Sequence, residues 1–87
     1  MIPKPKRVEN PELIERIKNK GKCQMPNCKS SWGITCHHIK TKGSGGPDES
    51  ENLVRLCVQH HAEAHTGQIR KAQLKQLAEQ RIREEGE

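Results

Sequence analysis

Nine side chains able to bind a metal ion are concentrated in one segment of this 87-residue chain. All four cysteines and all five histidines lie between Cys23 and His65, a window of 43 residues. A tetrahedral ion takes four such ligands, so nine are too many for one site and close to the number that two sites need. Metal binding is therefore the chemistry to consider, either to stabilise a fold or to hydrolyse a bond.

The spacing divides these side chains into two groups. The first is a closed Cys3His set of the kind used for structural zinc, with two thiols from one turn and a Cys-x2-His pair where a strand enters a helix. Its members are Cys23, Cys28, Cys57 and His60. On a helix, His61 and His65 point about 90° away from the pair at 57 and 60. Their i, i+4 spacing lets two imidazoles reach one ion, so one helix can serve two metals.

A single zinc finger is the competing interpretation. It would use Cys23, Cys28, His61 and His65, with 32 residues in the gap where DNA-reading fingers have about 12. It would also leave Cys57, His60, His37 and His38 without a role. It is open whether the adjacent residues His37 and His38 can act on one target, because neighbouring side chains of a strand leave on opposite faces. A common target for both needs a strand end or a distortion, and a surface pair with no role is the alternative.

The composition limits the core that such a chain can build. Ile, Leu and Val contribute 7, 5 and 3 residues and Phe none, so these strongly apolar residues make up about 17% of the chain. That share is below the roughly 20% at which charged chains become disordered. Metal binding is the obvious source of the missing stability. No apolar run approaches the ~18 residues of a membrane span, and the first residues lack a secretory signal. We therefore expect a cytoplasmic protein without disulfides, whose cysteines act as thiolate ligands.

The positive charge is placed unevenly. The formal net charge is +5, and residues 1–22 hold seven Lys or Arg against three Glu, whereas residues 23–65 hold four of each sign. Such a basic flank suits a polyphosphate partner, although a solvated tail that only aids solubility is the alternative. The candidate nucleic-acid-binding residues are Lys4, Lys6, Arg7, Arg16, Lys18, Lys20 and Lys22, with Lys40, Lys42 and Arg55 from the central segment.

The elements that must position these ligands follow from local signals. Asn10 and Pro11 predict the start of a helix, and Gly21 its end. Trp32, the only aromatic residue, is expected to anchor the cysteine turn by packing. The predicted order is a helix at 11–20, a metal turn at 23–28, a strand at 34–39, a glycine-rich loop at 41–52, a strand at 53–56 and helices at 58–65 and 68–84. This order predicts one α+β domain, with a basic arm and helix over 1–22, a core over 23–65 and a C-terminal helix over 66–87.

Together these motifs resemble those of the HNH endonucleases, the ββα-metal or His-Me finger nucleases. The matching features are Cys23-x4-Cys28, Cys-His-His-Ile at 36–39, the glycines after it, Asn52-Leu-Val-Arg-Leu-Cys57 and His60-His61-x3-His65. They cover about half of the chain. The resemblance implies a small zinc-stabilised domain in which a β-hairpin lies against a helix with a divalent ion between them, flanked by N- and C-terminal helices. It also implies hydrolysis of DNA phosphodiester bonds, leaving 5′-phosphate and 3′-hydroxyl ends.

The resemblance also implies roles for individual residues. His38 would be the general base, since an imidazole suits proton transfer near neutral pH. The catalytic divalent ion would be held by His37, His61 and His65, with His61 counted among the catalytic residues. Asn52 would tie the glycine loop to the hairpin and help to orient His38. The implied cofactors are a structural Zn²⁺ and a catalytic Mg²⁺, Mn²⁺, Ni²⁺, Co²⁺ or Zn²⁺.

Two departures from the family pattern matter. His60 stands where a fourth cysteine is common, and Cys36 is a competing ligand, although a small buried strand residue is the more usual role for it. Many members have Asp where this chain has His37, and imidazoles shift the preference from Mg²⁺ towards the later divalent ions. The expected partner is duplex DNA read with low sequence specificity, together with phage DNA-processing proteins. A non-catalytic zinc-dependent nucleic-acid-binding module and an RNA nuclease are the alternatives.

Overall fold

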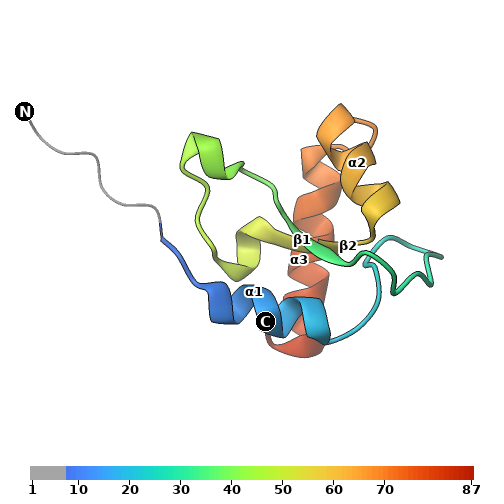
Figure 1. Ribbon diagram of the computed structural model, residues 1–87, viewed down its shortest axis with the longest axis horizontal. Helices are drawn as coiled ribbons and strands as arrows, with labels where there is room; N and C mark the ends of the chain where they lie inside the picture. The colour runs from blue at the N-terminus through green and yellow to red at the C-terminus, as the bar shows by residue number, and fades with distance from the viewer. Residues whose placement is uncertain (1–7) are drawn as a thin grey trace, which may run out of the picture.

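The computed structural model describes residues 8–87 and shows two antiparallel strands and three helices (Figure 1). The elements are α1 (Pro11–Asn19), β1 (Thr35–His38), β2 (Leu53–Leu56), α2 (Val58–Thr66) and α3 (Lys71–Glu85), with short 3₁₀ helices η1 (Lys42–Ser44) and η2 (Ser50–Asn52) between the strands. The predicted α+β class is confirmed. Within residues 8–87, no helix is both long and apolar enough to cross a lipid bilayer.

The two strands form a hairpin whose two faces carry different side chains. The register pairs His37 with Val54 and His38 with Leu53. Because directly opposed residues share a face, His37 lies on the side of Val54 and His38 on the side of Leu53. Figure 1 shows α1 and α2 on opposite sides of the strands, with α3 running behind them. The adjacent histidines therefore leave the strand towards different helices.

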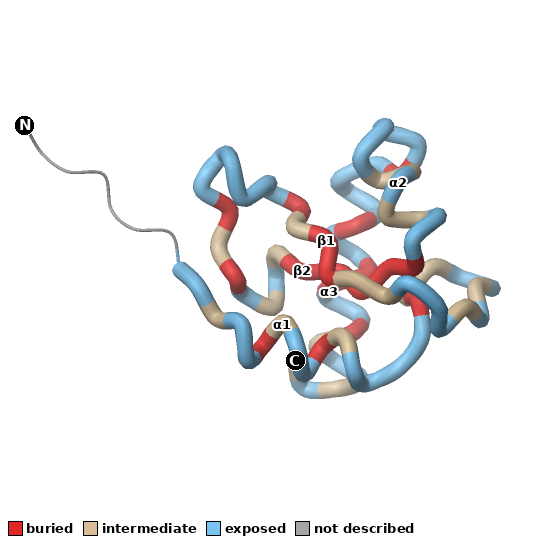
Figure 2. Tube along the Cα trace, viewed as in Figure 1, coloured by how far each residue is buried: buried red, intermediate tan, exposed pale blue. Residues whose placement is uncertain are grey.

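The core consists of two apolar clusters, one on each side of the hairpin. Leu13 and Ile17 of α1 pack with Cys36 and Leu53. The larger cluster joins the strands to the C-terminal helix, and its members are Cys23, Ile39, Val54, Leu56, Cys57, Ile69, Leu74, Leu77 and Ala78. Figure 2 shows the buried residues along the strands and the inward faces of α1 and α3, whereas α2 is half-buried or exposed. Helix α2, which carries three of the seven predicted metal ligands, thus contributes little to the apolar core.

Helix α1 begins where the sequence predicts. The Asn10 side chain accepts a hydrogen bond from the Leu13 N–H at 3.1 Å, and Pro11 occupies the first turn. This cap satisfies an N–H group that the helix itself leaves unpaired. The cap also sets the direction in which the preceding residues approach the loop between the strands.

Two buried arginines cross-link the hairpin to its surroundings. The Arg55 guanidinium donates to the carbonyl of Lys22 at 2.7 Å and to the carboxylate of Glu85 at 2.8 Å. Arg81 donates to the carbonyl oxygens of Leu53 and Ser50. Buried cations are tolerated when acceptors surround them in this way. The prediction that Arg55 contacts nucleic acid is therefore corrected, because its charge is used inside the fold.

The expected packing role of Trp32 is also corrected, since 74% of this residue is exposed. The cysteine turn closes without it, through a hydrogen bond from the Cys23 N–H to the Ser30 carbonyl at 3.1 Å and one from the Cys28 N–H to the Met25 carbonyl at 3.1 Å. Because the backbone pairs with itself, the turn needs no aromatic anchor.

Candidate functional site: two metal clusters on one helix

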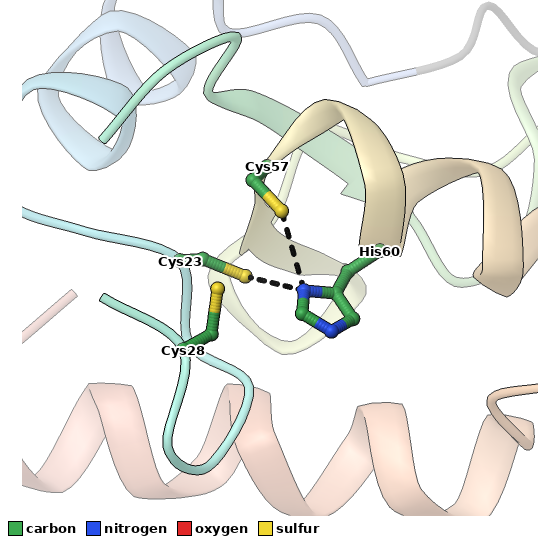
Figure 3. A group of neighbouring side chains, drawn as sticks. All are labelled: Cys23, Cys28, Cys57 and His60. Carbon is green, nitrogen blue, oxygen red and sulfur yellow. Dashed lines mark hydrogen bonds between the residues drawn. The ribbon is translucent and has the colours of Figure 1, made fainter. Parts of the chain in front are cut away.

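The predicted Cys3His set comes together at the start of α2. Its four ligand atoms all lie within 4.8 Å of one another. The His60 Nδ1 atom is 3.4 Å from the Cys23 sulfur and 3.2 Å from the Cys57 sulfur. Tetrahedral zinc with ordinary bond lengths places sulfur and nitrogen ligands about 3.5 Å apart. Figure 3 shows the four side chains, with Cys28 completing the set, converging from the turn and from α2. This cluster could bind a metal such as zinc.

Gln24 fastens the cysteine turn to the hairpin and to α3. Its backbone N–H donates to the Arg55 carbonyl at 2.8 Å, and its side-chain oxygen accepts from the Arg55 N–H at 2.7 Å. Its side-chain amide donates to the Leu77 carbonyl at 2.8 Å. These bonds place Cys23 beside the first turn of α2, where Cys57 is the N-terminal cap residue.

The thiols of this cluster differ in acidity. Burial raises the pKa of Cys23 to about 11. Burial acts in the same direction on Cys57, but hydrogen bonds from the backbone and ring of His60 and from the neighbouring thiols outweigh it and lower that pKa to about 7. Of these two thiols Cys57 therefore ionises first, and metal binding would release the proton of Cys23.

Cys36 lies outside the cluster, on the hairpin face that packs against α1. Its thiol donates weakly to the Ile14 carbonyl at 3.5 Å, and burial raises its pKa to about 11. A thiol held protonated among apolar side chains is a poor ligand. Among the two candidates for the fourth position, the structure thus brings His60 to the sulfurs and leaves Cys36 in the core.

The second cluster consists of His37, His61 and His65, called here the histidine trio. Their ligand atoms also lie within 4.8 Å of one another. The Nε2 atoms of His61 and His65 are 3.1 Å apart, close to the roughly 3.3 Å expected for two imidazoles on one tetrahedral ion. His37 is buried, and within residues 8–87 its Nδ1 atom has no hydrogen-bond partner. Converging lone pairs and an unsatisfied buried nitrogen fit a bound cation.

The lowered pKa values of two histidines of the trio also favour metal binding. Burial and the nearby imidazoles of His61, His65 and His38 lower the pKa of His37 to about 4. Burial and the proximity of His65 lower the pKa of His61 as well. At neutral pH these two rings are therefore uncharged, which is the form that binds metals.

An open pocket of about 410 Å³ joins the trio to His38. Its other lining residues are Ile14, Lys18, Thr35, Cys36, Thr41 and Lys42. All four residues of β1 line this pocket, and β1 pairs with β2 along one edge only, so His37 and His38 reach one pocket from the other edge although they leave the strand on opposite faces. Two lysines at the same pocket give it a positive charge.

The loop between the strands supplies a residue that the sequence analysis missed. The Nε2 atom of His38 lies 2.7 Å from Oδ1 of Asp48, and the two side chains are only 10% and 4% exposed. The available signal was a carboxylate just after the glycine-rich stretch, ten positions from His38, but Glu49 and Glu51 follow it closely and offer the same chemistry. Its partner could not be read from spacing alone.

Asn52 holds the two ends of this loop together. Its side-chain oxygen accepts from the Lys40 N–H at 2.7 Å, and its amide donates to the carbonyls of Lys40 at 3.1 Å and Pro47 at 2.9 Å. All the polar atoms of the amide are thus used by backbone groups. Asn52 is placed to fix the loop rather than to bind a metal.

The predicted basic residues fall into different environments. Arg16 and Lys20 pair with Glu87 at 2.8 and 3.1 Å. Lys18 and Lys42 line the pocket, and Lys18 also lies 3.6 Å from the Glu15 carboxylate. Lys22 and Lys40 are exposed. Lys4, Lys6 and Arg7 lie outside the described residues. The positive charge nearest the trio thus comes from Lys18 and Lys42.

The pocket combines features that suit hydrolysis of an anionic ester: neutral imidazoles able to hold a cation, an imidazole bonded to a carboxylate, and two ammonium groups. No protein-family model, curated protein or solved structure matches the chain.

Proposed function

We propose that the protein is a metal-dependent HNH-type endonuclease that hydrolyses phosphodiester bonds in duplex DNA. The observation that carries the proposal is the convergence of His38 and the histidine trio on one pocket that also contains Lys18 and Lys42. The β1–β2 hairpin followed by α2, with the trio between β1 and α2, supports a ββα-metal arrangement. The Cys3His cluster would hold a structural zinc ion and secure the cysteine turn to this unit.

The residues of the pocket take distinct roles in the reaction. Lys18 and Lys42 attract the phosphate backbone by their charge. His38 accepts the proton of the attacking water as its oxygen bonds to phosphorus, and the bond from phosphorus to the 3′ oxygen breaks. The leaving oxygen takes a proton from solvent, which gives a 3′-hydroxyl and a 5′-phosphate.

The histidine trio would hold the catalytic divalent ion. When bound, such an ion stabilises negative charge on the scissile phosphate and on the leaving oxygen. Three imidazole donors favour Mn²⁺, Co²⁺, Ni²⁺ or Zn²⁺ over Mg²⁺, which prefers oxygen ligands. The pocket is open to solvent, and among residues 8–87 no Phe, Tyr or Trp lines it, in keeping with weak sequence preference.

Cleavage of supercoiled plasmid in each of these divalent ions tests the proposal. His38→Ala should lower the rate by about 10²–10⁴-fold, the usual contribution of a general base. His38→Gln, which can still donate to Asp48, should be equally inactive. Zinc content and circular dichroism should match those of the wild type for both variants.

Two outcomes would redirect the assignment. If no divalent ion supports cleavage while the zinc-loaded protein still shifts DNA in gels, the non-catalytic binding module is the better description. If matched RNA is cut and DNA is not, the protein is an RNA nuclease.

A further inference from the structure

The Asp48 carboxylate bridges two segments behind the proposed general base. Its Oδ1 atom lies 2.7 Å from His38 Nε2, and its Oδ2 atom accepts a hydrogen bond from the Asn10 N–H at 2.9 Å. The Asp48 N–H donates to the Val8 carbonyl at 2.9 Å. The carboxylate is buried and does not line the pocket, whereas His38 does.

This geometry selects one tautomer of His38. An ionised carboxylate accepts hydrogen bonds and cannot donate them, so the Nε2 atom facing Asp48 has to carry a proton. The lone pair of the neutral ring is then on Nδ1.

We infer that Asp48 is a positioning residue that holds His38 as its Nε2–H tautomer, so that Nδ1 is the basic nitrogen. The tautomer follows from the contact between His38 Nε2 and an ionised Asp48 carboxylate. Its catalytic consequence rests on the proposed function. Asp48 acts through His38 and touches neither the pocket nor the trio.

Asn52 acts on His38 indirectly, by holding the loop that carries Asp48. Asn52 binds the Pro47 carbonyl, and Pro47 directly precedes Asp48. Gly46 completes the closure, because a Cβ atom there would lie only 1.7 Å from the Lys40 carbonyl oxygen. Asn52 therefore holds the loop in the form that presents Asp48 to His38.

Asp48→Asn is the informative substitution. One carboxylate oxygen becomes an NH₂ group, which must face either the Asn10 N–H or His38 Nε2. The first arrangement opposes two donors, so the second is favoured, and Nε2 must then accept a hydrogen bond. The proton of His38 moves to Nδ1, and the nitrogen needed as a base is lost.

The ¹⁵N chemical shifts of the zinc-loaded protein report the tautomer directly. We expect Nε2–H in the wild type at alkaline pH, where free imidazoles are neutral, and Nδ1–H in Asp48→Asn. The kcat of plasmid cleavage should fall by about 10²–10⁴-fold with KM unchanged. The matched control is Glu49→Gln, which removes the same charge from the neighbouring exposed residue and should change neither readout.

The results separate this inference from the proposed function. An Nδ1–H tautomer in the wild type would overturn the inference even if the protein cuts DNA, and it needs no folded variant. Equal kcat values for Asp48→Asn and wild type would do the same. If the tautomer changes as expected but the wild type has no nuclease activity, the positioning role stands and the proposed function fails.

Discussion

The Cys3His cluster and the histidine trio share helix α2 but differ in almost every other respect. Cys57 and His60 lie in its first turn and meet thiols from a turn that is fastened to β2 and α3. His61 and His65 lie on another face and meet His37 beside an open pocket. One cluster connects segments of the fold, whereas the other leaves room for a further ligand. The number of protein ligands, the donor type and the access to solvent together separate a stabilising site from a working site.

The largest expected effect is on the first cluster. Cys57→Ser should abolish zinc binding and unfold the protein, because structural zinc contributes about 10–16 kcal/mol in small domains and this chain has a thin apolar core. Metal analysis and far-ultraviolet circular dichroism would show both losses. The matched control is Cys36→Ser, a buried thiol outside the cluster, which should cost only about 0.5–3 kcal/mol. Equal damage from the two substitutions would contradict the assignment of ligands.

The next effect is confined to the second cluster. His65→Ala should lower the affinity of the trio for a divalent ion by at least about 10- to 100-fold, with a parallel loss of cleavage. The melting temperature should change little, because His65 is exposed. Isothermal titration with Mn²⁺ and thermal melts would measure the two quantities, with Thr66→Ala as the neighbouring control. A collapse of the fold in His65→Ala would show that the trio is structural as well.

Metal removal should separate the two clusters in time. A chelator should strip the open trio first and the closed Cys3His cluster only at higher concentration or after longer exposure. Cleavage activity is therefore expected to disappear while the circular dichroism spectrum is still native. Samples taken along one chelator titration can be assayed for bound metal, activity and helicity. Loss of activity and helicity at the same point would show that the two clusters do not differ in how readily they lose metal.

The smallest expected effect is on the stability of the fold at acidic pH. The pKa of His37 is about 4 in the folded protein against an ordinary value of 6.5, because the ring is buried beside other imidazoles. Between these values the unfolded chain binds more protons, so the free energy of unfolding falls as pH drops from 6.5 to 4. His37→Gln should remove this part of the decline. Urea unfolding of the zinc-loaded protein at several pH values would test it, and an unchanged slope would argue against burial of a neutral His37.

Much of the fold was accessible from local signals. The predicted helix at 11–20 and strand at 53–56 agree with α1 and β2, because Asn10 caps one and short apolar runs mark the other. The last helix begins at Lys71 rather than 68. The N–H groups of Gln68 and Ile69 both donate to the Glu63 carbonyl, and Ile69 is buried in the core. These hydrogen bonds at the end of α2 and the burial of Ile69 thus delay the start of a helix whose sequence pattern extends further.

The two predictions that the structure corrects, for Arg55 and Trp32, failed for the same reason. Arg55 was grouped with surface cations by its charge, yet carbonyl oxygens and Glu85 surround it in the fold. Trp32 was expected to pack because it is aromatic, but its turn closes through backbone hydrogen bonds. Charge and hydrophobicity describe a side chain, whereas its surroundings depend on segments far away in the sequence.

The sequence by itself determined which side chains could bind metals and how they divide. Ligand chemistry is a property of residue type, and the i, i+4 and Cys-x2-His spacings act within one helix. Only the tertiary structure decided the long-range partners. It places His60 rather than Cys36 beside the cysteine sulfurs, His37 beside His61 and His65, and Asp48 in contact with His38. The physical reason is that these pairings depend on strand register and on how the loop closes, and both are set by packing and hydrogen bonds across the whole chain.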